Sequence, residues 1–396
     1  MYYVKNNYEI ELVHAMGETC HEKKPTRTVV FVSRSLDYFS LRDSSMSSSS
    51  QVFEYGLVLA LNKLVNLKIV QLGSEPREIR LLSGLRFCSV NYRSLLGIFQ
   101  LAKVVYRNRN GGNFSVITTG YYPLEISTIV ICAKIFGGTS FSYIYDTHLA
   151  ATQKMSRWKR TLANLYFWSG FYWVEKLSGV LVLNDIFIRK KKITVPFLKT
   201  KIGILMHKKQ LNFKSSVIPF RNIIVFAGTI NAENGADLLI LFLKKNPDLE
   251  FELHFYGDGD RAADIAALTI SDTRVKYFGR ISDNLLQKRL RSADLLLNLR
   301  DPECISCDYA FPSKLINFMA TGTPVLSNHF PGLDDSYAKL LYMVSTFETG
   351  EFSKKMISLL NFGIDITIGI RARNFVEEQH QWGAIAAEIA AFVEKR

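Results

Sequence analysis

The sequence has few cysteines, no long hydrophobic run and no leader-like start. No stretch of its 396 residues reaches the roughly 18 uninterrupted apolar residues that a membrane-spanning helix needs. Residues 1–27 are polar and irregular, without the apolar core of a secretory signal. Of five cysteines, Cys304 and Cys307 form a CxxC pair, but no second pair completes a zinc site. These absences favour a cytoplasmic protein with reduced thiols, no cofactor and no bound metal.

Signatures of nucleic-acid and dinucleotide binding are also missing. The sequence has no zinc finger, no aromatic and basic RNA motif and no basic region linked to heptads. The serine-rich loop after the first predicted strand contains no GxGxxG. The formal net charge is nevertheless +13, which suits phosphorylated small molecules or an acidic membrane surface, or simply a well-solvated exterior. We therefore expect no nucleic-acid partner.

The chain length and the hydrophobic pattern predict two α/β domains. The chain is too long for one ordinary domain, and a hydrophobic content of 48% is enough to build real cores. Strand-like and helix-like segments alternate, as is typical of parallel sheets wrapped by helices. The expected parts are an irregular extension at 1–27, Rossmann-like domains at 28–210 and 211–375, and a terminal segment at 376–396 within one long helix.

Residues 293–328 are the most informative stretch. Their sequence, ADLLLNLRDPECISCDYAFPSKLINFMATGTPVLSN, predicts a buried strand, a loop, a helix that begins at Ser313 and stops at Gly322, and another strand. A strand end that leads into a helix often binds an anion, because free backbone N–H groups face it. Lys314 gains nothing from the helix dipole in the first turn, so a ligand phosphate explains it well. An ordinary connection with a solvated lysine is the alternative.

A second polar group follows the strand predicted at 140–145. Asp146, Thr147 and His148 stand at its carboxyl end, the edge where α/β sheets place their sites. A histidine there can contact a substrate hydroxyl or a leaving group, or it can cap the next helix. We favour a functional role for His148.

Residues 162–177 form the most aromatic part of the chain. As a helix, the segment LANLYFWSGFYWVEKL is apolar around much of its circumference, so something must cover it. Burial inside the first domain is the interpretation that we favour. Insertion at a bilayer interface is the alternative, because Lys154, Arg157, Lys159 and Arg160 precede the aromatic run.

The order of motifs in the second half resembles the donor-binding domain of GT-B-fold glycosyltransferases, close to the retaining family 4. These motifs are FAGTINAENGADLLI at 226–240, HFYGDGD at 254–260, VKYFGRIS at 275–282 and AFPSKLINFMATGTPVLSN at 310–328. The terminal segment with Trp382 resembles the helix that crosses back to the first domain in that fold. The resemblance implies two Rossmann-like domains that face each other across a cleft.

The same resemblance implies a function. A metal-independent, retaining glycosyltransferase would move a hexose-like sugar from a nucleotide sugar, a UDP or GDP conjugate, to a lipid-linked or polysaccharide acceptor. The reaction would take place at the cytosolic face of the cell membrane, in surface-glycan synthesis by a peripheral membrane protein. The residues that the resemblance assigns to the donor are Gly228, Thr229, Asn234, Arg280, Ile281, Ser313, Leu315 and Asn317, and those that it assigns to catalysis are His148 and Lys314.

Four positions depart from the family pattern. The family usually has arginine where Thr229 stands and lysine where Asn234 stands, and glutamates where Tyr309 and Asn317 stand. Asn317 can still bind sugar or ribose hydroxyls, and Lys314 would restore part of the positive charge, as in PSKL-bearing variants of the fold. The departures leave a second hypothesis, a degenerate, non-catalytic GT-B subunit that binds and stabilises a partner glycosyltransferase.

Overall fold

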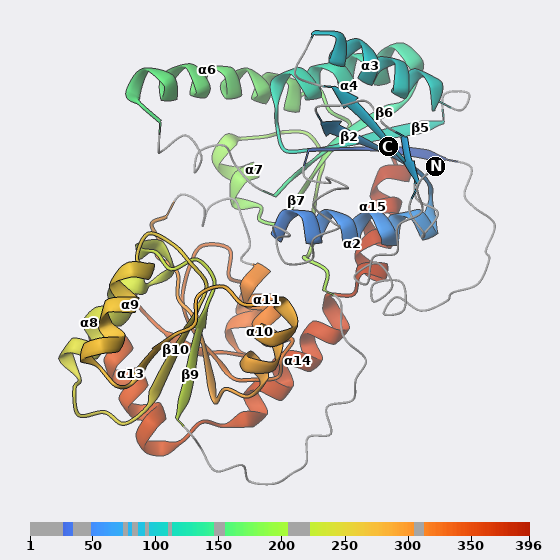
Figure 1. Cartoon of the computed structure of the whole chain (residues 1–396). Coiled ribbons are helices and arrows are strands. Elements are labelled where there is room, and N and C mark those ends of the chain that lie inside the picture. The colour runs from blue at the N-terminus through green and yellow to red at the C-terminus, as the bar shows by residue number, and fades with distance from the viewer. Residues whose placement is uncertain are drawn as a thin grey trace. The chain divides into compact units, whose positions relative to one another are not determined.

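The computed structural model describes residues 27–34, 49–73, 78–80, 86–91, 95–109, 113–145, 155–204, 222–304 and 313–396. The chain divides into two compact units (Figure 1). Unit 1 comprises 1–207, 309–311 and 380–396, and unit 2 comprises 208–308 and 312–379. None of the described helices is long and apolar enough to cross a membrane.

Unit 1 is built on an eight-stranded sheet in the order β3-β4-β2-β1-β5-β6-β7-β8. Neighbouring strands are parallel, except that β3 runs antiparallel to β4. The strands are β1 (Thr28–Ser33), β2 (Asn66–Gly73), β3 (Glu78–Arg80), β4 (Arg86–Asn91), β5 (Phe114–Thr119), β6 (Thr139–Ile144), β7 (Gly179–Val182) and β8 (Phe197–Lys199). The helices are α2 (Ser49–Leu64), α3 (Leu95–Arg107), α4 (Pro123–Phe136), α6 (Arg157–Val174), α7 (Ile186–Lys191) and α15 (Trp382–Glu394).

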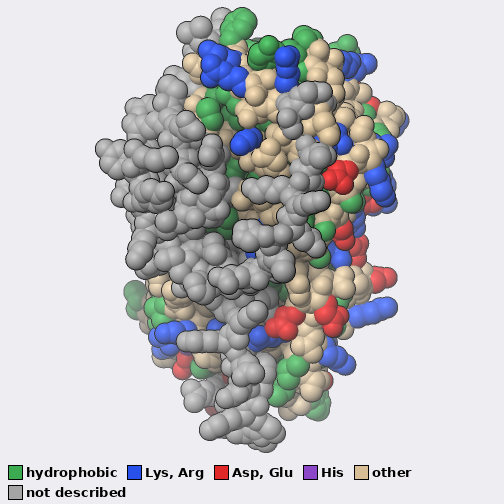
Figure 2. All heavy atoms as spheres, turned by 90° about the vertical axis from the view of Figure 1, so that its right-hand side faces the viewer, with side chains coloured by type: hydrophobic (Ala, Val, Ile, Leu, Met, Phe, Trp, Pro, Cys, Tyr) green, Lys and Arg blue, Asp and Glu red, His purple; other side chains and the backbone are tan. Residues whose placement is uncertain are grey.

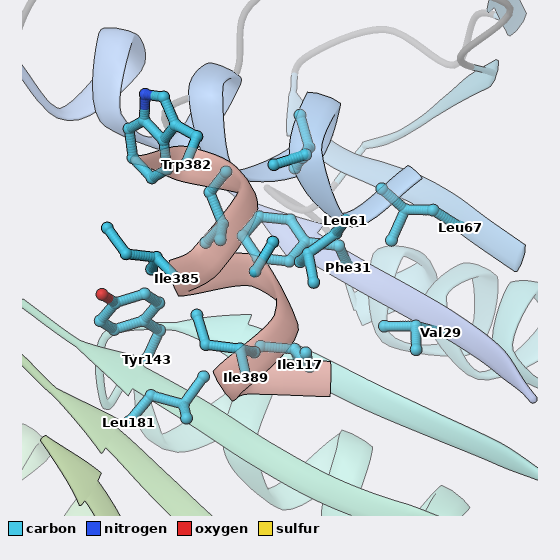
Figure 3. Close-up of a cluster of buried hydrophobic side chains, with 14 of the residues drawn as sticks. Val29, Phe31, Leu61, Leu67, Ile117, Tyr143, Leu181, Trp382, Ile385 and Ile389 are labelled. Carbon is cyan, nitrogen blue, oxygen red and sulfur yellow. The ribbon is translucent and has the colours of Figure 1, made fainter. Parts of the chain in front are cut away.

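Helices cover both faces of this sheet, which explains why the central strands are apolar throughout. Every residue of β1 is buried, as a parallel strand between two helix layers requires. Val29 and Phe31 pack on the face covered by α2 and α15. Val30 and Val32 pack on the opposite face with residues of α3 and α4. The side chains of α15 point into the first of these clusters (Figure 3).

Unit 2 is built on a six-stranded sheet that is parallel throughout, in the order β11-β10-β9-β12-β13-β14. Its strands are β9 (Ile223–Ala227), β10 (Glu252–Tyr256), β11 (Val275–Tyr277), β12 (Leu295–Asn298), β13 (Val325–Asn328) and β14 (Tyr342–Val344). Its helices are η2 (a 3-10 turn, Ala232–Asn234), α8 (Ala236–Lys245), α9 (Ala262–Ser271), α10 (Asp283–Arg291), α11 (Ser313–Met319), α12 (Asp335–Ala338), α13 (Thr349–Phe362) and α14 (Ile366–Gln379).

The strand order of unit 2 reverses direction between β9 and β12. From β9 the chain proceeds outward through β10 to β11, and it then returns to the other side of β9 at β12. In open parallel sheets ligands bind beyond the carboxyl ends of the strands at this kind of switch point. The loops after β9 and β12 are therefore where a site is expected, and they contain the motifs that the sequence singled out.

The C-terminal segment differs from the single long helix expected from the sequence. Helix α14 ends at Gln379, and α15 begins at Trp382. At the break, His380 Nδ1 donates a hydrogen bond to the carbonyl of Ile202 at 2.6 Å. The amide of Ile204 donates to the carbonyl of His380 at 3.0 Å. These bonds to unit 1 take the place of helical ones, so α15 belongs to unit 1.

Candidate functional site

Three glycines shape the loops that follow β9 and β10. Gly228, Gly257 and Gly259 have φ angles of 123°, 129° and 156°, a region that side-chain-bearing residues rarely adopt. A Cβ on Gly257 would lie 1.9 Å from the carbonyl oxygen of Gly228, and one on Gly259 would lie 2.3 Å from that of Ile230. The two loops therefore pack backbone against backbone. This packing leaves Gly228 and Thr229 exposed at the loop tip.

Asn234 closes the β9 loop on itself. Its side-chain Nδ2 donates to the carbonyl of Thr229 at 3.1 Å and to Oδ1 of Asn231 at 2.7 Å. Its backbone N–H donates to the same Oδ1 at 3.0 Å. The side chain thus supports the loop that carries Gly228, and neither Asn234 nor Thr229 brings a positive charge to it.

Lys314 supplies a positive charge at this place. Although the residue is partly exposed, its Nζ is buried and has no hydrogen-bond partner in the part of the chain that is described. Nζ lies 4.8 Å from the ring centroid of Phe226 and 5.6 Å from that of Phe318. A Cβ on Gly228 would lie 3.2 Å from Lys314 Cδ and 3.8 Å from Nζ. The ammonium therefore lies directly beside the glycine loop.

The surroundings of this ammonium disfavour its charge. Burial and, to a smaller extent, the positive charge of Arg300 together lower the pKa of Lys314 from 10.5 to about 7. A buried charge without a partner is costly, and an anion beside it removes much of that cost. The arrangement is suited to a ligand that brings negative charge to Gly228.

The other predicted residues of α11 point in different directions. The side chain of Leu315 is 0% exposed, so only its backbone can contact a ligand. Ser313 is partly exposed at the first position of the helix, and Asn317 is exposed.

The loop after β11 is connected to the glycine loops. The amide of Gly257 donates to the carbonyl of Gly279 at 2.8 Å, and Tyr277 Oη donates to the carbonyl of Gly257 at 3.2 Å. Arg280 is mostly exposed, with Nε 4.0 Å from Asp258 Oδ2, and Ile281 is partly buried. The loops after β9, β10 and β11 thus form one connected edge of the sheet.

Unit 1 contains a polar group that the sequence analysis missed. Glu54 in α2 is fully buried and accepts hydrogen bonds from Ser33 Oγ and Tyr145 Oη. Both donors lie at carboxyl ends of strands. The only sequence signal for this group is a single carboxylate within an apolar helix.

A second buried carboxylate lies in the first turn of α4. Glu125 is 1% exposed and pairs with Arg34, whose guanidinium lies 4.0 Å from the ring centroid of Tyr122. Burial raises the pKa of Glu125 to about 7 although the charge and hydrogen bond of Arg34 lower it. His148 and Tyr309 lie outside the described residues, so the role of His148 stays a prediction.

The family comparison matches the second half of the chain. Residues 221–361 match the family model described as Glycosyl transferases group 1, and these residues include every donor-site position considered above. No curated protein matches the chain.

Solved structures resemble the whole chain at low sequence identity. Sucrose-phosphate synthase from Thermosynechococcus elongatus aligns with a TM-score of 0.66 at 14% identity, covering 93% of this chain and 98% of that one. Anabaena HepE in complex with UDP aligns with a TM-score of 0.66 at 11% identity, covering 93% and 100%. The lipopolysaccharide outer core galactosyltransferase WaaB in its apo form gives 0.63 at 13%, also covering 93% and 100%.

The fold is α/β, with two Rossmann-like units, and it is the GT-B fold. The family match over 221–361 together with this fold supports a glycosyltransferase, which confirms the resemblance seen in the sequence.

Proposed function

We propose that the protein transfers a sugar from a nucleotide sugar whose diphosphate binds beside Gly228 and Lys314. The observation that carries the proposal is the buried Nζ of Lys314, which lacks a described hydrogen-bond partner and lies beside a glycine loop. A diphosphate supplies the missing negative charge, and a glycine lets it approach the backbone closely.

The proposed reaction uses the same charge in the transition state. The bond between the anomeric carbon and a diphosphate oxygen breaks, and negative charge develops on the leaving diphosphate. The Lys314 ammonium stabilises this charge strongly because its surroundings exclude water. The acceptor hydroxyl bonds to the anomeric carbon from the face that the diphosphate leaves, and its proton passes to a donor phosphate oxygen. This route retains the configuration and requires no metal.

His148, which lies outside the described residues, is proposed as a catalytic residue that would contact the transferring sugar. Ser313 and the backbone of Leu315 are proposed to donate hydrogen bonds to the diphosphate, and Arg280 and Ile281 to contact the base. A UDP conjugate is the proposed donor over a GDP conjugate, because Anabaena HepE structures contain UDP, UDP with glucose, and UDP-glucose.

The proposed acceptor is a lipid-linked or polysaccharide glycan at the cytosolic face of the cell membrane. One structural relative is a lipopolysaccharide outer core galactosyltransferase, which supports surface-glycan synthesis as the setting. In this proposal the protein is cytoplasmic and peripheral on the inner face of the membrane.

A non-catalytic subunit remains the second candidate, and one observation favours it. Asn234 stands where the family pattern has lysine, and its uncharged side chain is hydrogen-bonded within its own loop. The donor site described here therefore contains fewer cations than the family pattern implies. Such a protein would retain the fold and would bind nucleotide weakly, without turnover.

A thermal-shift titration with UDP, GDP, ADP and their sugar conjugates tests the donor site. Saturable stabilisation by one nucleotide is expected for the native protein. Release of nucleoside diphosphate from the conjugate that binds, in the presence of a membrane-extracted acceptor, then tests turnover. Absence of any shift in folded protein would contradict the donor site, whereas binding without release under all acceptor conditions would favour the non-catalytic subunit.

A further inference from the structure

Helix α6 carries apolar side chains on two opposite faces, and only the inner face is packed. Gly170 and Val174 are buried there, and a Cβ on Gly170 would lie 2.4 Å from the carbonyl oxygen of Tyr121. The ring of Phe171 stacks on that of Tyr121 at 5.1 Å between centroids. These contacts fix the rotation of α6 about its axis.

The outer face of α6 presents large apolar side chains to solvent. Trp158, Leu162, Leu165 and Tyr172 are 63%, 58%, 59% and 62% exposed. Their spacing of i, i+4, i+7 and i+14 places them on one stripe, which runs for about 21 Å at 1.5 Å per residue. Trp168, at the side of the stripe, is 72% exposed. Burial of the aromatic segment, the interpretation favoured from sequence, is therefore wrong for this face.

The two neighbouring helices extend this apolar surface. Helix α4 packs between α3 and α6 on one face of the sheet (Figure 1). Ile131 and Ile135 of α4 are 45% and 68% exposed, and Phe99 of α3 is 71% exposed. We call α3, α4 and α6 the outer helix layer.

The outer helix layer is strongly basic. Its sequence contains one acidic residue, Glu125, which is buried and paired with Arg34. Its cations are all exposed, and they are Lys103, Arg107, Lys134, Arg157, Lys159 and Arg160. Figure 2, which views the molecule from another side, shows exposed hydrophobic side chains next to Lys and Arg side chains. A partner of this surface must therefore be apolar and negatively charged.

We propose that the outer helix layer binds the surface of an anionic lipid bilayer, with α6 lying in the plane of the interface. Tryptophan and tyrosine favour the boundary between headgroups and acyl chains, and flanking cations attract anionic headgroups. The apolar side chains of α6 project from a straight stripe and do not line a groove. Such a projecting stripe fits a flat, fluid surface. Of the four tryptophans in the chain, Trp158, Trp168 and Trp173 belong to α6.

Sedimentation with vesicles tests the apolar stripe. The full chain should bind vesicles of phosphatidylglycerol and phosphatidylcholine far better than vesicles of phosphatidylcholine alone. The triple variant Trp158→Ser, Leu162→Ser, Trp168→Ser should lose at least tenfold in partitioning. The matched control Ile270→Ser with Phe362→Ser removes apolar side chains that are 90% and 88% exposed in unit 2, and it should bind as the native chain does.

Charge substitutions test the electrostatic attraction between α6 and the anionic lipid. The triple variant Arg157→Gln, Lys159→Gln, Arg160→Gln should bind about 100-fold more weakly at low salt, since each cation near an anionic surface contributes about fivefold. Lys244→Gln with Lys245→Gln, at exposed positions of α8, should have no such effect. Brominated lipids should quench the fluorescence of α6 tryptophans and leave that of buried Trp382 unchanged.

Three results would overturn the proposal. Equal binding to charged and uncharged vesicles would rule out recognition of anionic headgroups, and no binding would remove the bilayer as the partner. A dimer of the chain that the triple serine variant dissociates would instead assign the outer helix layer to a second copy. These measurements need no nucleotide sugar, so their failure leaves the proposed donor site untouched.

Discussion

At the scale of single residues, the proposed binding of a nucleoside diphosphate depends on the charge of Lys314. The pKa of its ammonium is about 7 because the group is buried near Arg300. A bound diphosphate should raise this pKa, because opposite charges favour the ionised form. The free protein therefore loses the proton as pH rises above about 7, while the complex retains it.

This linkage predicts a pH-dependent affinity. Nucleoside diphosphate binding should be strongest below about pH 7 and should weaken by up to tenfold per pH unit above it. Calorimetric titrations from pH 6 to 9 measure this affinity. Lys314→Met is the control, because ionisation of the ligand itself affects binding to both proteins equally. Identical pH profiles for the native and variant proteins would contradict the account.

The glycine loops give a second prediction at this scale. Gly257→Ala would place a Cβ 1.9 Å from the carbonyl oxygen of Gly228 at a φ of 129°. We expect the free energy of unfolding to fall by about 3 kcal/mol or more, with loss of nucleotide binding. Gly350→Ala is the matched control, because a Cβ there meets nothing within 4 Å. Equal urea midpoints for the two variants would contradict the close packing of these loops.

The sequence predicted part of the site at this scale. The resemblance to GT-B glycosyltransferases implied that Gly228 and Lys314 lie close together, and the structure places Lys314 beside Gly228. The hydrogen bonds of Glu54 and the ion pair of Glu125 could not be expected from the sequence, since their partners come from distant strands and helices. A single carboxylate in an apolar helix does not reveal which residues will surround it.

At the scale of elements, the side chain of Trp382 anchors the start of α15 in unit 1. Trp382 is 4% exposed, and its ring lies 5.4 Å from that of Phe53. Cβ atoms on Gly56 and Gly203 would lie 2.4 and 2.2 Å from the indole. The two glycines therefore form a slot for the indole.

Substitutions in this slot should destabilise unit 1. Trp382→Ala should lower the free energy of unfolding by about 3–5 kcal/mol through the cavity that it leaves, and Gly203→Ala should lower it by overpacking. Gly383→Ala, in the same helix with nothing within 4 Å of the new Cβ, should raise it by about 0.5–1 kcal/mol. Chemical denaturation measures all three, and a harmless Gly203→Ala would contradict the slot.

The break before α15 predicts acid sensitivity. Burial lowers the pKa of His380 from 6.5 to about 4, although its hydrogen bond to Ile202 raises it. The unfolded chain therefore binds a proton between these pH values that the folded protein does not. Stability should fall as pH decreases from about 6.5 to 4, by on the order of 3 kcal/mol. His380→Asn should reduce this pH dependence in denaturation experiments, and an unchanged slope would contradict the assignment.

Elements were predictable where periodicity alone determines them. The strands β12 and β13 agree with the sequence interpretation, and Ser313, which was expected as the N-cap, is the first residue of α11. The division between α14 and α15 was not predictable, because bonds to Ile202 and Ile204 replace a regular helical turn. The exposure of α6 was also missed, since an apolar pattern does not say whether protein covers each face.

At the scale of the whole molecule, alternating strands and helices predicted two parallel α/β units, and the structure has them. The fold alone does not determine the reaction, because the same fold serves many reactions. The proposed binding of a nucleotide sugar beside Lys314 therefore needs a direct test.

The most direct test is calorimetric titration of UDP and GDP into the native protein, Lys314→Met and the exposed control Lys244→Met, at pH 6.5. Lys314→Met retains the packing against Phe226 and Phe318 but removes the ammonium. The account predicts that it binds the preferred nucleotide about ten- to hundredfold more weakly, while the apo variant is more stable than the native protein by about 1–3 kcal/mol. Equal affinity of all three proteins, or no binding by folded native protein, would contradict the proposed donor site.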